Sequence, residues 1–218
     1  MKAEDVDLLA YEKGLYEQGI QLIAGVDEVG RGPLAGPVVA ASVILPVDAQ
    51  IVGVNDSKKI SAKKRAVYYQ EILEVAVAVG IGSASVAEID ELNILQATKL
   101  AMKRAVDALD VKPEYLLIDH LTLEMNLPEL GITKGDSKSL SIAAASIVAK
   151  EVRDQMMAEL GKTYPAYGFE KNAGYGTKAH REALKNHGYI KEVHRQSFEP
   201  VKSMVASTST HNYLTNSS

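Results

Sequence analysis

Short apolar runs rich in β-branched residues alternate with periodic, helix-like segments along most of this chain. Such runs predict strands, and the longer amphipathic segments between them predict helices. The expected strands are residues 21–29, 37–45, 75–85, 113–119 and a short one starting at 132. The expected helices are residues 4–18, a segment capped by Ser61, residues 86–109, the later part of 132–160 and residues 177–187. Strands that alternate with helices are typical of an α/β fold.

Composition excludes several classes of protein and site. No run approaches the ~20 apolar residues of a transmembrane helix, and we expect no signal peptide and no membrane association. The 218 residues include no cysteine, so disulfides and thiolate metal sites are excluded. The net charge of −4 argues against a broadly basic nucleic-acid surface. A location in the reducing cytoplasm is consistent with this composition.

Carboxylates stand at strand ends or in turns at three separate places. Asp27 and Glu28 end the first strand, Asp119 ends the fourth, and Asp136 lies in a Gly-Asp-Ser turn. Strand ends of α/β sheets commonly carry the functional site, so these four side chains are expected to converge. Converging carboxylates repel by roughly 1 kcal/mol per pair at 4 Å even in water, so a cation is needed to compensate them.

Hard oxygen ligands without a histidine or cysteine set favour Mg²⁺ or Mn²⁺. Two such ions about 3.5–4 Å apart form the clamp used for in-line displacement at phosphorus. The glycines of Gly30-Arg31-Gly32, directly after the acidic pair, permit a close backbone approach to a ligand. The spacing alone leaves open that each acid is a turn or capping residue.

The chain also resembles the bacterial ribonuclease HII family in a series of motifs that follow one another in register, from about residue 22 to 202. They are AGVDEVGRGPLAGPVVAA, NDSKK, IDELNILQAT, LLID, KGDSKSLSIAAASIVAKEVRD, GYGTKAH and HRQSFEPVK. The resemblance implies an RNase H-like fold, with a mixed central sheet flanked by helices and a C-terminal helical extension. We accordingly expect a lead-in over 1–20, a catalytic domain over 21–202 with a helical part from about 163, and a flexible polar tail over 203–218.

The implied activity is that of a monomeric endonuclease that acts on RNA–DNA hybrids and on duplex DNA with embedded ribonucleotides. It would cleave the RNA strand of a hybrid and incise 5′ of a single ribonucleotide, leaving a 3′-hydroxyl and a 5′-phosphate. Such incision would serve ribonucleotide removal from DNA. Two Mg²⁺ or Mn²⁺ ions would take part in the hydrolysis.

The resemblance also assigns roles to individual residues. The family's metal-binding and catalytic carboxylates correspond to Asp27, Glu28, Asp119 and Asp136. Its substrate-binding residues correspond to Gly30, Arg31, Gly32, Lys58, Lys138 and Tyr175. The Gly-Arg-Gly loop would read the ribose 2′-hydroxyl, the tyrosine would stack on the following deoxyribose, and the two lysines would contact phosphates.

Two positions depart from the family pattern. Asn172-Ala173 replaces a common His-Lys pair, so one backbone-contacting cation is missing, with Lys171 or Lys178 as substitutes. His120 follows Asp119 where many members have glycine, and a lone histidine is more often structural. Asp154 is expected on a helix surface or behind the ligands. Most other basic clusters, such as Lys150 with Arg153, are expected on solvated helix faces.

Two alternatives remain beside this hypothesis. The first is another metal-dependent nuclease of the RNase H-like group, such as a 3′–5′ exonuclease or a junction resolvase. It would not need the loop and the tyrosine that read a 2′-hydroxyl. The second is a non-catalytic module that kept the fold, and the intact acidic set argues against it. Cleavage of a duplex with one ribonucleotide, with and without Mg²⁺, separates both from the main hypothesis.

Overall fold

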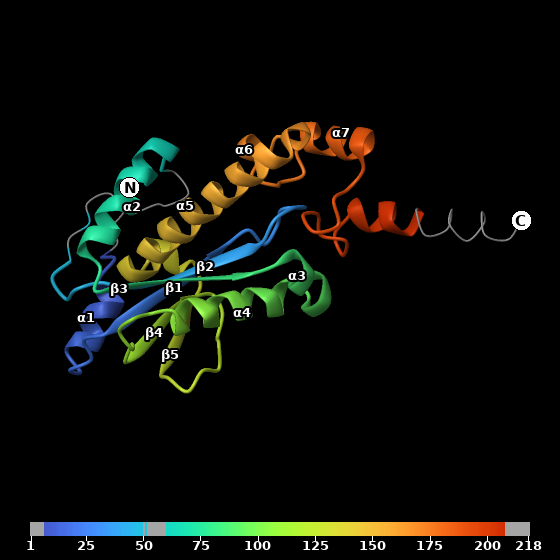
Figure 1. Ribbon diagram of the computed structural model, residues 1–218. Coiled ribbons are helices and arrows are strands. Elements are labelled where there is room, and N and C mark those ends of the chain that lie inside the picture. The colour runs from blue at the N-terminus through green and yellow to red at the C-terminus, as the bar shows by residue number, and fades with distance from the viewer. Residues whose placement is uncertain (1–6, 50, 52–59, 208–218) are drawn as a thin grey trace, which may run out of the picture. The chain divides into compact units, whose positions relative to one another are not determined.

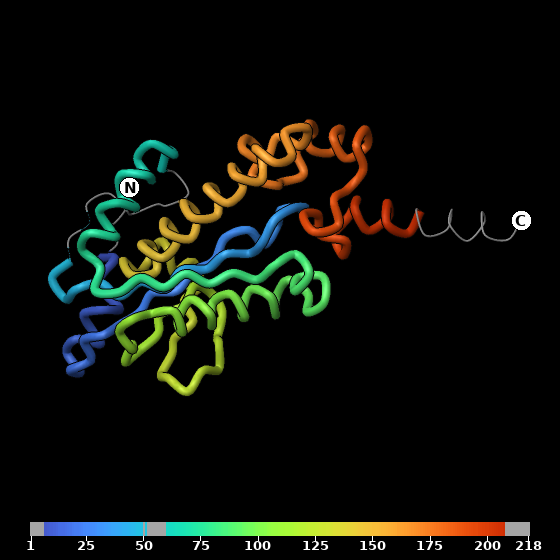
Figure 2. The backbone as a smooth tube through the Cα atoms, in the orientation of Figure 1, coloured from blue at the N-terminus to red at the C-terminus, as the bar shows by residue number. Residues whose placement is uncertain are grey.

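The computed structural model describes residues 7–49, 51 and 60–207, and these fall into two compact units. The first unit takes its described residues from 7–29, 39–83 and 98–152. The second takes them from 30–38, 84–97 and 153–207, so the chain enters it three times (Figure 2). The C-terminal helical part, expected from about 163, lies in the last segment of this second unit, and that segment starts at 153.

Five strands form one mixed sheet in the order β3-β2-β1-β4-β5 (Figure 1). They are β1 (Ile23–Val29), β2 (Val38–Ile44), β3 (Ala78–Ala84), β4 (Tyr115–Asp119) and β5 (Glu129–Ile132). β1 pairs antiparallel with β2 and parallel with β4, and β4 pairs parallel with β5. The predicted α/β class and the mixed sheet are therefore confirmed.

The helices lie close to the predicted segments. They are α1 (Ala10–Tyr16), α2 (Ala62–Val75), α3 (Val86–Leu92), α4 (Ile94–Asp107), α5 (Leu140–Thr163), α6 (Phe169–Asn172) and α7 (Lys178–His187), with 3₁₀ turns η2 (Gly135–Ser137) and η3 (Pro165–Tyr167). Ser61 caps α2 as predicted, because its hydroxyl accepts a hydrogen bond from the backbone N–H of Lys64. None of the described helices is long and apolar enough to cross a membrane.

In the first unit α4 and α5 cover opposite faces of the sheet (Figure 1). Val79 and Ile81 of β3 pack against the cluster that contains Ala143–Ala145 and Ile147–Ala149 of α5. Gly80 and Gly82, which alternate with them, lie against the backbone of α4 instead. Successive side chains of a strand point to opposite faces, so each helix has its own side of the sheet.

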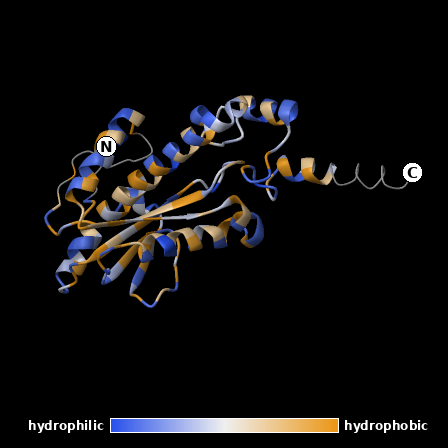
Figure 3. Cartoon of the chain, in the orientation of Figure 1, coloured by the Kyte–Doolittle hydropathy of each residue, from blue (hydrophilic) through white to orange (hydrophobic). Residues whose placement is uncertain are grey.

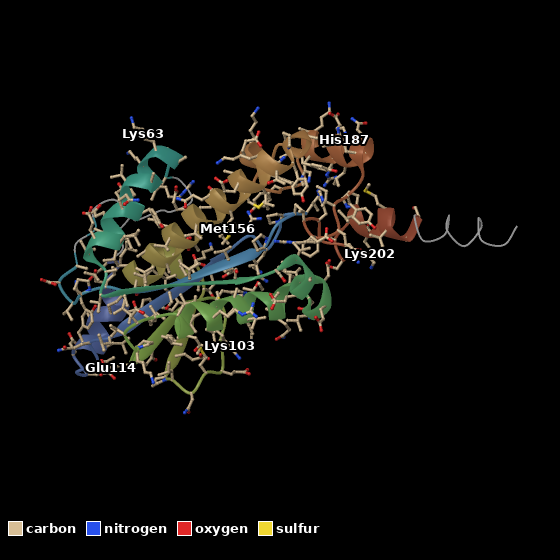
Figure 4. The ribbon with its side chains drawn as sticks, viewed as in Figure 1. Lys63, Lys103, Glu114, Met156, His187 and Lys202 are labelled. Carbon is tan, nitrogen blue, oxygen red and sulfur yellow. The ribbon has the colours of Figure 1, made fainter. Side chains whose placement is uncertain are left out.

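β1 runs through the middle of this sheet and is held at its start and at Gly25. Gly25 lies so close to α5 that a Cβ atom there would be 2.0 Å from the carbonyl carbon of Ser141. At the start of the strand, Glu114 accepts hydrogen bonds of 2.9 Å from the backbone N–H groups of Gln21 and Leu22 (Figure 4). β1 therefore has a fixed position relative to β4 and to α5.

α5 begins over a buried carboxylate. Glu12 of α1 is 2% exposed, and its Oε1 accepts hydrogen bonds from the hydroxyls of Ser139 and Ser141 and from the backbone N–H of Ser141. A carboxylate is favourable at a helix N-terminus, where backbone donors are unsatisfied. The strands of the sheet contain many hydrophobic residues (Figure 3). β2 is buried along its whole length.

The second unit has its own apolar cluster. Met157 of α5, Phe169 of α6 and Leu184 of α7 pack there with Tyr167 and Val201. The rings of Tyr167 and Phe169 are stacked with centroids 5.5 Å apart. The Tyr167 hydroxyl donates a 2.9 Å hydrogen bond to the carbonyl of Gly188, just after His187 ends α7 (Figure 4).

Some boundaries differ from the prediction. The single helix expected over 86–109 is two helices, because Asn93 has a positive φ of 72° and its side chain accepts hydrogen bonds from the N–H groups of Leu95 and Gln96. The strand expected from 132 instead ends there. The expected polar tail starts at 203, but residues 201–207 are helical, with Met204 and Val205 packed on the second unit's cluster; residues 208–218 lie outside the described part.

Candidate active site

Three acidic side chains meet at the carboxyl ends of β1 and β4. The parallel pairing places Val26 opposite Ile118, so the next residues, Asp27 and Asp119, stand side by side. Asp27, Glu28 and Asp119 each offer a carboxylate oxygen, and these oxygens lie within 4.8 Å of one another. The structure therefore brings together three of the four carboxylates predicted to converge.

Asp27 is the most buried member of this cluster, at 5% exposure. It follows Gly25 on the face of β1 that α5 covers, and it accepts hydrogen bonds from the Ser146 hydroxyl and from the backbone N–H of Glu28. Burial, and then the negative charges of Glu28 and Asp119, raise the pKa of Asp27 well above its usual value. A cation among these oxygens would remove that repulsion, so the donor set fits a hard divalent ion.

Asp136 occupies a buried turn next to this cluster but is not one of its three members. It lies in η2 at 6% exposure. The preceding residue, Gly135, donates a 2.6 Å hydrogen bond from its backbone N–H to Oδ1 of Asp119. A Cβ atom at Gly135 would lie 2.6 Å from Cδ1 of Ile142 and 3.3 Å from that same oxygen, so a larger residue there would displace one of these side chains.

The Gly-Arg-Gly loop belongs to the second unit, where two buried arginines hold it. Gly30 has a positive φ of 94°, and a Cβ atom there would lie 2.2 Å from Nε of Arg153. Arg195 donates hydrogen bonds to the carbonyls of Gly30 at 2.6 Å and of Arg31 at 2.9 Å. Arg31 is half-buried, whereas Gly32 is exposed.

Tyr175 is close to the exposed end of this loop. A Cβ atom built on Gly32 would be 3.6 Å from Cε1 of the tyrosine ring. The ring is 43% exposed, while the backbone carbonyl of Tyr175 lies 2.9 Å from Nδ1 of the buried His180. The residues predicted to read the ribose and the following deoxyribose are therefore neighbours.

Comparison with known proteins agrees with this arrangement. The family model for ribonuclease HII matches residues 24–201. Ribonuclease HII of Bacillus cytotoxicus is 56% identical over 204 residues, which cover 94% of this chain and 78% of that protein. This chain belongs to the ribonuclease HII family. The ribonuclease HII of a Geobacillus species is likewise 56% identical over 199 residues, 91% of this chain and 72% of that protein.

Solved structures of ribonucleases H have the same fold. Ribonuclease H2 of Pyrococcus horikoshii superposes with a TM-score of 0.70 at 25% identity, covering 84% of this chain and 96% of that one. RNase HII of Archaeoglobus fulgidus, solved in a complex with PCNA, gives 0.70 at 28% identity, covering 82% and 95%. The predicted RNase H-like fold is confirmed.

The departures from the ribonuclease HII pattern have structural explanations. Asn172 donates to the carbonyl of Tyr167 at 2.7 Å and accepts from the backbone N–H of Gly174 at 2.8 Å, so it shapes the turn before Tyr175. Ala173 has a positive φ of 48°. Asn172-Ala173 is thus part of the turn, and the candidate substitute cations Lys171 and Lys178 are exposed beside it.

The remaining predicted residues are placed as follows. Lys58 lies outside the described residues, and Lys138 is exposed directly after η2. His120, which received no role, is exposed with a positive φ of 65°, and Asp154 is half-buried on α5.

One expectation about a basic residue was wrong. Arg153 was expected on a solvated helix face, but it is fully buried. Its donors go to the carbonyls of Pro37, Ala173 and Ala35 at 3.0, 2.9 and 3.1 Å. The helical spacing of charged residues indicates a solvent-exposed face. It contains no information about carbonyl groups that distant loops bring to that face, so it could not predict the burial of Arg153. A signal existed for Arg153, because its motif also contains the predicted site residues Asp136 and Lys138. The motif that contains Arg195 holds no predicted site residue.

Proposed function

We infer that this protein is an endoribonuclease that cleaves the RNA strand of RNA–DNA hybrids and incises on the 5′ side of single ribonucleotides in duplex DNA. Membership of the ribonuclease HII family supports the reaction class. The observation that carries the proposal is the joint presence of the Asp27–Glu28–Asp119 cluster and of an exposed Gly32 beside Tyr175. The first is suited to phosphodiester hydrolysis and the second to recognition of a ribose.

Divalent metal ions would be held by Asp27, Glu28 and Asp119, with Asp136 as a fourth carboxylate. Oxygen donors and the absence of cysteine favour Mg²⁺ or Mn²⁺. When bound, two such ions stabilise the negative charge that develops on the attacking and leaving oxygens of an in-line displacement at phosphorus. Ser146 and the backbone N–H of Gly135 would orient Asp27 and Asp119, since each donates to one of these carboxylates.

Substrate choice would depend on Gly30, Arg31, Gly32 and Tyr175. A loop with two glycines brings backbone groups within hydrogen-bonding distance of a 2′-hydroxyl, which both donates and accepts. A site built to pair that hydroxyl is left with an unsatisfied polar group when deoxyribose replaces ribose, and this can cost roughly 10⁴–10⁵-fold in discrimination. The exposed Tyr175 ring would stack on the deoxyribose that follows the ribonucleotide.

Lys58 and Lys138 would contact backbone phosphates, which position a duplex without reading its sequence. We also infer that the enzyme acts as a monomer in the cytoplasm. Its incision there would begin the removal of ribonucleotides from DNA.

The test uses a DNA duplex with one ribonucleotide, labelled at its 5′ end. With Mg²⁺ or with Mn²⁺ we expect one internal cut on the 5′ side of the ribonucleotide. The labelled product should carry a 3′-hydroxyl that a polymerase extends. The matched all-DNA duplex, and the same reaction with a chelator, should remain uncut. Stepwise shortening from the 3′ end, or cutting of the all-DNA duplex, would instead support another nuclease of this fold.

A further inference from the structure

Arg195 is fully buried, and its guanidinium group faces the carbonyl groups of one loop. Nε donates to Gly36 at 3.0 Å, Nη1 to Arg31 at 2.9 Å, and Nη2 to Gly30 at 2.6 Å and to Gly36 at 2.8 Å. Burial and the charge of Arg153 lower the pKa of Arg195 to about 9, so it remains protonated at neutral pH. The planar fork of arginine reaches three carbonyls at once, which a lysine ammonium cannot do in the same geometry.

These bonds determine how two peptide groups of the loop are oriented. In a trans peptide the carbonyl of one residue and the N–H of the next point in opposite directions. The carbonyls of Gly30 and Arg31 point toward Arg195, so the N–H groups of Arg31 and Gly32 point away from it. Gly32 is exposed. Its amide is therefore directed outward, where it can donate to a sugar hydroxyl or to a phosphate oxygen.

A chain of hydrogen bonds connects His194 to Tyr175. The backbone N–H of Ile190 donates to Nδ1 of His194 at 2.9 Å, so the proton of this neutral ring is on Nε2. That nitrogen lies 3.1 Å from Nε2 of His180, which must accept. Nδ1 of His180 then carries its proton and donates to the carbonyl of Tyr175 at 2.9 Å. Both rings are fully buried, and each nitrogen has one role.

The backbone of His194 and Arg195 completes the link between the two segments. Ala35 and His194 form an isolated β-bridge, and the N–H of Arg195 donates to the carbonyl of Leu34 at 2.9 Å. Leu34 in turn donates from its N–H to the carbonyl of Gly174, next to Tyr175, at 2.8 Å. The side chain of Arg195 thus contacts the Gly-Arg-Gly loop. The side chain of its neighbour His194 is connected through His180 to the carbonyl of Tyr175.

We propose that His194 and Arg195 are positioning residues that hold the Gly30–Gly32 loop and Tyr175 in one arrangement and thereby set the preference for an RNA–DNA junction. This proposal rests on the proposed function. A single ribonucleotide followed by deoxyribose engages both the loop and the tyrosine, whereas a continuous hybrid offers ribose at both positions. A looser connection between the Gly30–Gly32 loop and Tyr175 should therefore reduce cleavage of the junction substrate more than cleavage of the hybrid.

The first test replaces Arg195 by lysine, with Arg104→Lys as the matched control. Arg104 also donates to a backbone carbonyl, that of Ser83 at 2.8 Å, but lies exposed on α4. We measure kcat/KM on a duplex with one ribonucleotide and on a continuous RNA–DNA hybrid, together with Mn²⁺ affinity by titration. For Arg195→Lys the ratio of the two kcat/KM values should fall by about tenfold or more, since misplacements of about 1 Å can cost about 100-fold. Mn²⁺ affinity should match wild type, and Arg104→Lys should keep the wild-type ratio.

The second test uses a pair of variants at His180, which supplies the bond to the Tyr175 carbonyl. His180→Leu removes that bond, whereas His180→Gln keeps one acceptor for His194 and one donor for Tyr175. The junction preference should be lost in the leucine variant and at least partly restored in the glutamine variant. This pair decides the matter if Arg195→Lys does not fold, as judged by circular dichroism.

Equal losses on both substrates, with the wild-type ratio preserved in Arg195→Lys or in His180→Leu, would overturn the proposal and leave the arginine and histidines as stabilising groups only. Failure of the wild-type protein to incise the single ribonucleotide would be a different result. It would refute the proposed function itself.

Discussion

The backbone N–H of Gly135 donates a 2.6 Å hydrogen bond to Oδ1 of Asp119, so the turn that contains Asp136 is attached to a member of the acidic cluster. This bond fixes the orientation of the Asp119 carboxylate at Oδ1. Changes at 119 and at 136 are therefore expected to differ in degree: the first removes a member of the three-carboxylate cluster, and the second removes a fourth carboxylate in the turn attached to that cluster.

Asp119→Asn should abolish cleavage while leaving substrate binding largely intact. The amide keeps an acceptor for Gly135 but removes a negative charge, which weakens metal binding and also lessens repulsion of phosphates. The loss of metal affinity should exceed the roughly 10–100-fold cost of losing a partner outside the ligand set. Single-turnover cleavage in Mg²⁺ and duplex binding in a chelator are the measurements. Near wild-type cutting by this variant would remove Asp119 from the ligand set.

Asp136→Asn is expected to reduce cleavage by a smaller factor than Asp119→Asn, because Asp136 is not a member of the three-oxygen cluster. Raising the Mn²⁺ concentration should restore part of the activity. Ser137→Ala, in the same turn, is the control and should retain wild-type cleavage. A loss at Asp136 equal to that at Asp119, with no rescue by added metal, would place Asp136 among the principal ligands.

Tyr175→Ala should lower cleavage of the junction substrate by about tenfold or more, in line with stacking energies of about 1–3 kcal/mol. The melting temperature should change little, because Tyr175 is 43% exposed, and binding should fall far less than cleavage. Cleavage and melting are to be measured on the same preparation. An equally stable variant with unchanged junction cutting would refute the role of this ring.

Gly25→Ala is expected to destabilise the protein strongly. Its Cβ atom would be 2.0 Å from the Ser141 carbonyl carbon, and such overpacking typically costs about 1–3 kcal/mol, occasionally more. The matched control is Gly14→Ala in α1, where a Cβ atom has no neighbour within 4 Å. That change should stabilise by up to about 1 kcal/mol through helix propensity. Urea unfolding of both variants gives the comparison, and equal stabilities would contradict the packing argument.

Acid should weaken the protein through its buried histidine pair. Burial, and then the charge of His180, lower the pKa of His194 to about 4, and burial also lowers the pKa of His180. The folded state then binds fewer protons than the unfolded state between about pH 4 and 6.5. The free energy of unfolding is therefore highest above this range and decreases as the pH is lowered through it. For His194 alone the loss from pH 7 to pH 5 is about 2 kcal/mol.

Urea unfolding at both pH values measures this slope. His194→Asn, which keeps an acceptor for Ile190 without titrating, should flatten it, whereas substitution of the exposed His187 by alanine should not. An unchanged slope in His194→Asn would show that other groups cause the acid loss.

Strand positions and the acidic pair were predictable because both follow from local patterns. Short apolar runs mark β1 and β4, and parallel pairing then brings Asp27 and Asp119 together. The break at Asn93 was missed, since a helical apolar pattern continues across it while the side chain caps the next helix. The roles of Arg153 and Arg195 were also missed, because their partners are carbonyl groups of residues far away in the sequence.

The central position of β1 affects the order of folding. β1 is made early, yet Gln21 at its start is bound by Glu114, 93 residues later in the chain. The carboxylate of Glu12 on α1 likewise gains hydrogen-bond partners only when Ser139 and Ser141 reach it. Closing such long loops costs entropy before any contact compensates it, which slows folding. A growing chain on the ribosome therefore lacks Asp119, one of the three carboxylates of the acidic cluster, until β4 is made, and the cluster is incomplete up to that point.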